Sequence, residues 1–261
     1  WIQYAEKKHP ELLENISTCR SPMQMLASIL KDQSAQSSRK PFHVAIMPCT
    51  AKKFEAARPE FTKDGEPIVD VVLTTQELIR MIKESGIMFN ELEPEAVNMP
   101  FATVSGAGVI FGVTGGVTEA VLRRGSSAKA RTALNMVEKA GQRGSEGIRE
   151  LEVPYGEAVL HIAVASGLGN AEKVIERMKN GEHFDFIEIM ACPGGCVCGG
   201  GQPFATVQDQ KERGKGLYEA DRQLSIRRSE ENPLMTSVYH DIIKGKVHEL
   251  LHVHYTHKEE E

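Results

Sequence analysis

The chain has 261 residues, 41% of them hydrophobic and 26% charged, which is the ordinary composition of a globular protein of one or two domains. Its 31 Lys and Arg residues against 36 Asp and Glu residues give a net charge of -5, which argues against a nucleic-acid binder that depends on a basic surface. The apolar runs, such as residues 44–47 and 186–191, are far shorter than the ~20 residues that cross a bilayer, which excludes a membrane-spanning helix.

Predicted helices and strands alternate in the first half of the chain. Apolar residues three and four positions apart predict a helix that ends with residues 6–16 and a second helix over residues 22–31. The capping-box pattern of Thr74 and Glu77 predicts the start of a helix over residues 76–84. Buried strands are predicted over residues 42–47 and 68–73.

The second half follows a strand–helix–strand order. A Gly-rich segment at residues 106–116 opens a predicted helix over residues 117–124, and residues 128–144 are predicted to be helical or irregular. A strand, a helix and a strand are predicted over residues 160–165, 170–179 and 184–190, followed by polar helices over residues 219–228 and 234–243. This order predicts an α/β fold of two lobes, with parallel-rich sheets covered by helices.

The two halves share a weak repeat at the ends of two predicted strands. Met47 and Cys49 follow one apolar strand with the spacing that Met190 and Cys192 have after another. Ligands of open α/β sheets bind outside the carboxyl ends of the strands, so the repeat predicts one site shared by Cys49 and Cys192. Chance similarity between two strand–helix units is the alternative interpretation.

Three of the five cysteines lie within seven residues. Cys192, Cys196 and Cys198 belong to the run MACPGGCVCGGGQP at residues 190–203, which also contains five glycines. An odd number of cysteines crowded in this way favours a metal or cluster site over a disulfide framework. Glycines beside cysteines let the backbone approach a bulky inorganic core. The spacing leaves an iron–sulfur cluster and zinc both open, and a flexible loop with incidental thiols is the structural alternative.

Two segments resemble the second and third cysteine signatures of the iron-only (FeFe) hydrogenases. They are MPCTAKKFE at residues 47–55 and MACPGGCVCGGGQP at residues 190–203. The resemblance continues through residues 105–112 and 227–232 and covers almost the whole chain. It implies one partial hydrogenase catalytic domain over residues 1–261. The implied parts are lobes of about residues 1–125 and 126–211, a metal cluster site between the lobes, and a C-terminal helical segment over residues 212–261.

The resemblance implies an H-cluster, in which a 4Fe-4S cubane is linked to a diiron subsite that carries CO, cyanide and dithiolate ligands. It assigns Cys49, Cys192 and Cys196 as cubane ligands, with Cys196 as the bridge to the diiron subsite. Lys52 matches a lysine that hydrogen-bonds a cyanide, and Glu55 matches the glutamate that pairs with this lysine. The other implied site residues are a serine near the second cyanide, a serine of the proton relay, two methionines beside the diiron subsite and an aromatic wall, namely Ser21, Ser17, Met47, Met190 and Phe111.

These assignments agree with elementary chemistry. An ammonium beside an anionic cyanide makes a strong charge-assisted hydrogen bond, and methionine side chains exclude water. Without the resemblance, Lys52 would be interpreted as a surface lysine and Met47 and Met190 as core packing.

The implied reaction is the reversible reduction of protons to hydrogen, 2H+ + 2e- to H2. A ferredoxin or another low-potential carrier would supply the electrons, and maturation proteins would deliver the diiron subsite. An oxygen-sensitive cluster of low potential implies an anaerobic setting. We expect a cytoplasmic rather than a periplasmic protein.

The sequence departs from the family at its first signature, Thr-Ser-Cys-Cys-Pro-Gly-Trp, because it begins at the tryptophan, Trp1. That signature supplies the fourth cubane cysteine and the cysteine that donates the proton. Cys19 lies where the family has no ligand, and Cys198 is too near Cys196 for both to reach one cubane without strain. We therefore expect the isolated chain to be inactive.

Two other functions compete with a hydrogenase. Hydrogenase-like assembly factors and sensory proteins share the cubane cysteines but lack the diiron pocket, so Lys52, Met47 and Met190 favour the catalytic branch. The run from His248 to His252, with Glu249 between them, matches the H-E-x-x-H motif of zinc peptidases. His254 and His257 are further candidate ligands, and a polar terminal helix with solvated histidines is the structural alternative.

Overall fold

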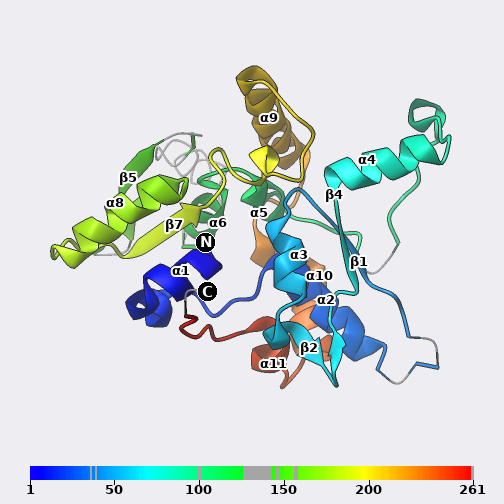
Figure 1. Ribbon diagram of the computed structural model, residues 1–261, viewed down its shortest axis with the longest axis horizontal. Coiled ribbons are helices and arrows are strands. Elements are labelled where there is room, and N and C mark those ends of the chain that lie inside the picture. Colours follow the sequence, from blue (N-terminus) through cyan, green and yellow to red (C-terminus); the bar gives the residue numbers. More distant parts are fainter. Residues whose placement is uncertain are drawn as a thin grey trace. The chain divides into compact units, whose positions relative to one another are not determined.

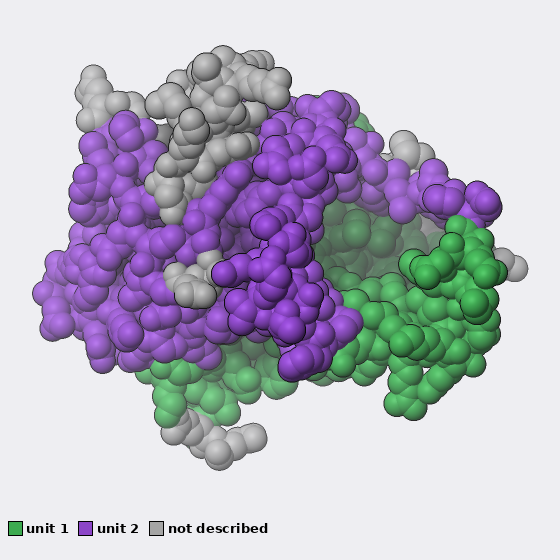
Figure 2. Space-filling view, turned by 90° about the horizontal axis from the view of Figure 1, so that it is seen from above, with its two compact units in different colours: residues 1–92, 236–261 green, residues 93–235 purple. Residues whose placement is uncertain are grey.

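The computed structural model describes residues 1–35, 37–38, 40–98, 101–125, 143–144, 147–155 and 158–259. Their fold is mixed α/β with small sheets, which confirms the expected class (Figure 1). The chain divides into two compact units, residues 1–92 with 236–261 and residues 93–235, which Figure 2 colours separately. The lobe boundaries expected from the sequence stay a prediction. Within the described residues, no helix is long and apolar enough to cross a membrane.

The first unit is built on a parallel pair of strands, β1 and β4, whose residues pair from Val44 with Val71 to Met47 with Thr74. Ser21 caps α2, and Thr74 and Glu77 form the predicted capping box of α4. The elements are α1 (Ile2–Lys8), a 3-10 helix (Pro10–Asn15), α2 (Pro22–Gln33), β1 (Val44–Met47), α3 (Ala51–Ala56), a 3-10 turn (Pro59–Phe61), β2 (Thr62–Lys63), β3 (Glu66–Pro67), β4 (Val71–Thr74), α4 (Thr75–Glu84), a 3-10 turn (Phe89–Glu91), a π-helical turn (Val238–Ile242) and α11 (Val247–Leu251).

The core of this unit lies between α2 and β4. Met23 and Ala27 from α2 pack with Phe61, Val72 and Val253, all of them buried. Burial of these apolar side chains is what holds the short two-stranded sheet, since two strands alone are marginally stable in water.

The second unit contains a three-stranded sheet in the order β5-β6-β7. β6 and β7 are parallel, as predicted, and the helix that connects them is α8; β5 is antiparallel to β6. The elements are α5 (Gly106–Val109), a 3-10 turn (Ile110–Gly112), α6 (Gly116–Gly125), β5 (Ile148–Tyr155), β6 (Ala158–Ser166), α8 (Leu168–Lys179), β7 (Phe186–Met190), a 3-10 turn (Cys196–Cys198), α9 (Val207–Gln223), a 3-10 turn (Ser229–Glu231) and α10 (Pro233–Ser237).

Several predicted elements need correction. The helix predicted to end with residues 6–16 ends at Lys8, because Pro10 has no N–H to continue the ladder. The first strand is not fully buried, since Val44 and Ile46 are each about half exposed. The antiparallel strand β5 was not predicted, and the predicted segment 128–144 lies outside the described residues except for 143–144.

The C-terminal helices also differ from the prediction. α9 runs over Val207–Gln223 rather than over residues 219–228, because a Thr206–Asp209 capping box starts it among polar residues. The helix predicted over residues 234–243 is the short α10 followed by a π-helical turn.

Candidate metal centre

Cys49 lies just beyond the carboxyl end of β1, between this strand and the first residue of α3. Its thiol is free and partly buried. Because β1 and β4 are parallel and end together at Met47 and Thr74, Cys49 follows the edge of the sheet where α/β proteins bind ligands. Met47 itself packs against the core of the unit.

The next helix, α3, carries two adjacent lysines with different partners. Nζ of Lys52 donates to Oε2 of Glu55 one turn later, and these side chains are only 29% and 15% exposed. Nζ of Lys53 instead donates to the carbonyl oxygen of Val72 over 2.7 Å and lies 2.9 Å from a carboxylate oxygen of Glu77. Lys53 thus ties α3 to the sheet, whereas Lys52 is held by one carboxylate of its own helix.

The two predicted site serines of this unit each accept a hydrogen bond from a backbone N–H two or three residues later. Oγ of Ser21 accepts a hydrogen bond from the backbone N–H of Gln24 and so caps α2. Ser17 is exposed, and its Oγ accepts from the backbone N–H of Cys19 over 3.3 Å. Within the first unit the structure therefore brings Lys52 and Glu55 together, and it gives both serines backbone partners.

In the second unit, the cysteine loop, which we define as residues 191–199, follows the carboxyl end of β7. The strand ends at Met190, whose carbonyl accepts from the N–H of Gly167 over 2.7 Å. The N–H of Gly194 donates to Oγ of Ser166, and the N–H of Gly195 donates to the carbonyl of Cys192. Cys192 and Cys196 therefore lie on one tight loop that is hydrogen-bonded to itself and to β6.

Gly195 explains why this loop needs glycine. Its φ of +93° belongs to a region that side chains rarely adopt. A Cβ on Gly195 would lie 2.7 Å from the backbone nitrogen of Thr114 and 2.8 Å from the carbonyl oxygen of Gly112. The cysteine loop therefore rests directly on the backbone of residues 112–114, next to Phe111.

A buried carboxylate fixes that supporting backbone. Glu188 of β7 is 5% exposed and accepts from the N–H of Gly115 over 2.6 Å and from the N–H and hydroxyl of Thr118 over 2.7 Å each. These donors include the unpaired N–H groups at the start of α6, where a negative charge is favourable. One strand thus carries the cysteine loop at its end and anchors the turn on which that loop rests.

The donor set of the second unit suits an iron–sulfur cluster. Cys192, Cys196 and Cys198 are partly buried cysteines that form no disulfide, and thiolates on a glycine-rich backbone are the usual ligands of such clusters. Burial raises the pKa of Cys198. Across the described part of the chain, no three His, Cys, Asp or Glu side chains lie close enough to hold a single metal ion. That finding gives no support to a mononuclear zinc site.

The histidines and the glutamate of the H-E-x-x-H motif are among the described residues that form no group of three metal ligands. His248 and His252 have ring centroids 4.8 Å apart, but the helix between them, α11, has only five residues. Nδ1 of His252 lies 2.8 Å from Oγ1 of Thr18, which engages this ring in a structural contact. The motif packs the C-terminal segment against residues 18–20.

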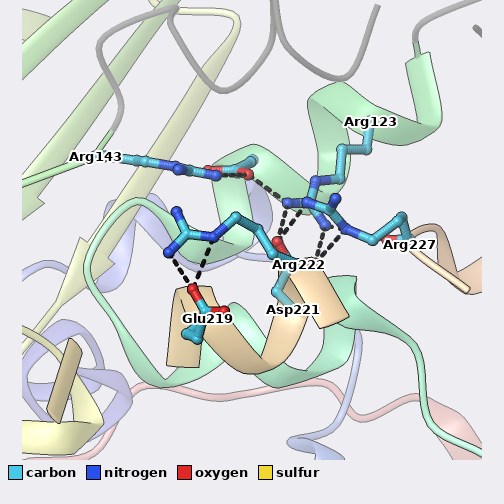
Figure 3. A network of polar contacts seen from close by, with 7 residues as sticks. Arg123, Arg143, Glu219, Asp221, Arg222 and Arg227 are labelled. Carbon is cyan, nitrogen blue, oxygen red and sulfur yellow. Dashed lines mark hydrogen bonds and ion pairs between the residues drawn. The ribbon is translucent and has the colours of Figure 1, made fainter. Parts of the chain in front are cut away.

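Sequence reasoning missed a buried charge network in the second unit (Figure 3). Arg123 of α6 is fully buried and donates to Glu119 over 2.6 Å and to both oxygens of Asp221 in α9. Burial alone would raise the pKa of Asp221, but hydrogen bonds from Arg123 and Arg227 outweigh it and lower the pKa. The one signal in the sequence was the spacing of Glu119 and Arg123, four residues apart on a predicted helix.

The chain matches two families, the iron only hydrogenase large subunit, C-terminal domain, over residues 1–200 and the iron hydrogenase small subunit over residues 208–258. It is 40% identical over 265 residues to the NADP-reducing hydrogenase subunit HndD of Solidesulfovibrio fructosivorans, covering 98% of this chain and 45% of that protein. It is 40% identical over 270 residues to iron hydrogenase 1 of Clostridium pasteurianum, covering 98% and 47%. The chain thus spans about half the length of these curated relatives.

A third relative is an iron–sulfur assembly protein. The chain is 33% identical over 273 residues to the cytosolic iron-sulfur assembly component 3 of Bos taurus, covering 98% of this chain and 57% of that protein. Among solved structures, a variant of the FeFe-hydrogenase of Chlamydomonas reinhardtii matches with a TM-score of 0.75 and 34% identity, covering 100% of this chain and 75% of that chain.

Proposed function

We propose, because the chain belongs to the iron-only hydrogenase family, that it forms part of an enzyme for the reversible reduction of protons to hydrogen. Cys49, Cys192 and Cys196 would hold a 4Fe-4S cubane, and Cys196 would link it to a diiron subsite. When bound, this group stores electrons and offers an iron at which hydrogen forms. The fit rests on the donor set, three cysteines outside any disulfide that each follow the end of a parallel strand.

The remaining site residues would act on the environment of the cluster. Lys52 would donate a hydrogen bond to a cyanide ligand, and Glu55 would hold the ammonium in place for it. Met47 and Met190 would exclude water with soft apolar side chains, and Phe111 would add an aromatic wall. Ser21 would contact the second cyanide, and Ser17, which is exposed, would stand on the proton path.

The observation that carries the proposal is the Lys52–Glu55 ion pair. Both side chains are partly buried on the helix that begins two residues after Cys49, and drawing a charged pair away from water has a desolvation cost. A cluster protein that lacks the diiron subsite has no anionic cyanide for Lys52 to meet. The pair therefore favours hydrogen turnover over a purely structural cluster.

Iron–sulfur assembly is the second candidate. The 33% identity with the bovine assembly component over 98% of this chain favours it specifically. An assembly or sensory protein would need the cubane cysteines but not Lys52, Met47 or Met190. Substitution of these three residues therefore separates the two functions.

Partners and location follow from the proposed reaction. A ferredoxin or another low-potential carrier would deliver electrons, and maturation proteins would insert the diiron subsite. A cytoplasmic location stays a prediction, and one relative, 41% identical over 208 residues, is named as a periplasmic hydrogenase large subunit of Nitratidesulfovibrio vulgaris.

Anaerobic iron–sulfur reconstitution tests the proposal. The chain is compared with a version extended at Trp1 by a segment that carries the first family signature, and iron content, electron paramagnetic resonance and, after diiron maturation, hydrogen evolution are measured. We expect only the extended form to hold a stable four-iron cluster and evolve hydrogen. Cys49→Ser and Cys196→Ser should abolish the cluster, whereas Cys19→Ser, the matched control, should not.

Other outcomes overturn the proposal in distinct ways. A full cubane in the extended form that never evolves hydrogen after diiron maturation supports the assembly or sensory function. Stoichiometric zinc with little iron contradicts a cluster site at these cysteines.

A further inference from the structure

The turn that ends β6 lies directly against the cysteine loop. β6 and β7 are parallel neighbours, and Ser166, the last residue of β6, pairs with Met190, the last residue of β7. The N–H of Gly167 donates to the carbonyl of Met190 over 2.7 Å. A Cβ on Gly167 would lie 3.4 Å from Cγ of Pro193. The end of β6 therefore contacts the cysteine loop at the residue that follows Cys192.

A hydrogen bond ties the middle of the loop to this turn. The N–H of Gly194 donates to Oγ of Ser166 over 3.1 Å, and Ser166 is only 3% exposed. Three other loop amides donate to carbonyl oxygens of the loop itself, namely those of Gly195, Cys198 and Gly199. Those three bonds shape the loop without tying it to β6. The Ser166 hydroxyl therefore holds the midpoint of the segment between Cys192 and Cys196.

The backbone on both sides of this hydroxyl is fixed. The N–H of Ser166 donates to the carbonyl of Gly147 over 3.0 Å, and its carbonyl accepts from Nδ2 of Asn170 in α8 over 2.7 Å. Because both backbone groups are bonded and the side chain is buried, Oγ has little freedom to follow a moving loop. A fixed acceptor favours one conformation of the loop, since a buried N–H that loses its acceptor has a desolvation cost.

From these contacts we propose that Ser166 is a positioning residue of the metal centre. Its hydroxyl holds Cys192 and Cys196 in the arrangement that binds and retains iron. Groups just outside the ligands of a metal site orient those ligands and affect how firmly the metal is held. Ser166 acts through the loop backbone at Gly194 and needs no contact with a cluster. The inference rests on the proposed function, because it concerns the proposed cluster ligands.

Thiol alkylation tests the positioning of the loop without any cluster. The 261-residue chain and its variants are treated with iodoacetamide, and mass spectrometry measures the rate at each cysteine. We expect Ser166→Ala to speed alkylation of Cys192 and Cys196 about fivefold, because the loss of one hydrogen bond lets the loop open more often. Cys49, which is partly buried in the first unit, should react at an unchanged rate, and this separates loop opening from global unfolding.

Two further substitutions isolate the contribution of the hydroxyl. Threonine and valine side chains have nearly the same shape, so Ser166→Thr keeps the acceptor and Ser166→Val removes it at equal volume. We expect the parent alkylation rates in Ser166→Thr and the faster rates in Ser166→Val. Ser34→Ala is the matched control, because it removes a serine hydroxyl that bonds the backbone carbonyl of Lys31 over 3.2 Å in the first unit. It should leave the alkylation of the cysteine loop unchanged.

Iron retention tests the link to the cluster. In the extended, reconstituted form, Ser166→Ala should lose iron to a chelator about fivefold faster than the parent, and Ser166→Thr should restore the parent rate. Unchanged alkylation in Ser166→Ala and Ser166→Val overturns the positioning of the loop. Faster alkylation with unchanged iron release overturns the role in iron retention. An extended parent form that binds no iron contradicts the proposed function and the iron-retention part of this inference, while alkylation still decides whether Ser166 positions the loop.

Discussion

The two cysteine-bearing segments resemble each other in sequence but are held in different ways. After β1, residues 48–50 lead directly into α3, and the side chains Lys52, Lys53 and Glu55 supply the contacts. After β7, the cysteine loop is held by its backbone, through Gly195 packed on residues 112–114 and through the support from Glu188. The first segment is thus adapted to present charge, and the second to hold thiols in a fixed position.

This difference predicts that the second segment tolerates far less change in shape. Gly195→Ala should destabilise the protein by about 4 kcal/mol, because the new Cβ would meet the backbone of residues 112–114 at a positive φ. Gly181→Ala is the matched control, since Gly181 has a φ of +94° but nothing within 4 Å of the added Cβ. It should cost only about 1 kcal/mol. Urea unfolding of both variants measures the difference, and equal losses would show that packing against residues 112–114 contributes nothing.

The support under the loop should be the next most sensitive feature. Glu188→Gln replaces one carboxylate oxygen by an NH2 group that cannot accept, so buried donors of Gly115 or Thr118 lose their partner. We expect a loss of about 2–3 kcal/mol in unfolding free energy, together with weaker iron binding after reconstitution. Glu176→Gln, at an exposed position of α8, is the control for both measurements. Normal stability of Glu188→Gln would contradict the anchoring role.

The first unit should respond to acid, through a network outside its cysteine-bearing segment. Beyond α3, Arg58 binds Glu6 through two hydrogen bonds of 2.6 and 2.9 Å and also binds Glu60. Burial alone would raise the pKa of Glu60, but hydrogen bonds from Arg58, its own backbone and Lys258 lower the pKa to about 2. A carboxylate with a lowered pKa stabilises the fold above its unfolded pKa, here 4.5, and that contribution is lost as the pH falls toward 2.

We therefore expect about 1–2 kcal/mol of stability to disappear between pH 4.5 and pH 2, and Glu60→Gln to lack this part of the pH dependence. Urea unfolding across that pH range measures the slope. Glu14→Gln, an exposed carboxylate outside the network, should keep the slope of the parent chain. Identical slopes for the parent chain and Glu60→Gln would rule out this contribution.

Local patterns predicted some helix starts and the order of strands, but they predicted several element ends and long-range burial poorly. The Thr74–Glu77 capping box and the parallel pair β6–β7 follow from residues close in sequence or from strand–helix–strand order, and the structure confirms them. The antiparallel β5 was missed because charged residues and Pro154 interrupt its apolar pattern.

Charged residues gave the least predictable features of the site. Arg123 and Asp221 are 98 residues apart in sequence, so nothing local marks their shared burial. Glu188 lies within a predicted strand, and only the fold reveals that its carboxylate caps α6. The cysteine spacing by itself marks a candidate metal site, and Lys52 is assigned through the resemblance to the hydrogenases, whereas the supports beneath the cysteine loop depend on tertiary contacts.

The smallest effect on stability should accompany the largest effect on function. Lys52→Gln removes a partly exposed ion pair and should change the unfolding free energy by about 1 kcal/mol or less. Lys53→Gln, at the adjacent position, loses a 2.7 Å hydrogen bond to Val72 and should destabilise the protein at least as much. In the extended, reconstituted form, only Lys52→Gln should abolish hydrogen evolution and shift the infrared stretching band of a cyanide ligand. Equal activity in the two variants would assign Lys52 a structural role like that of Lys53. The first segment would then serve, like the second, only to position its cysteine, and the contrast between the two segments would fail.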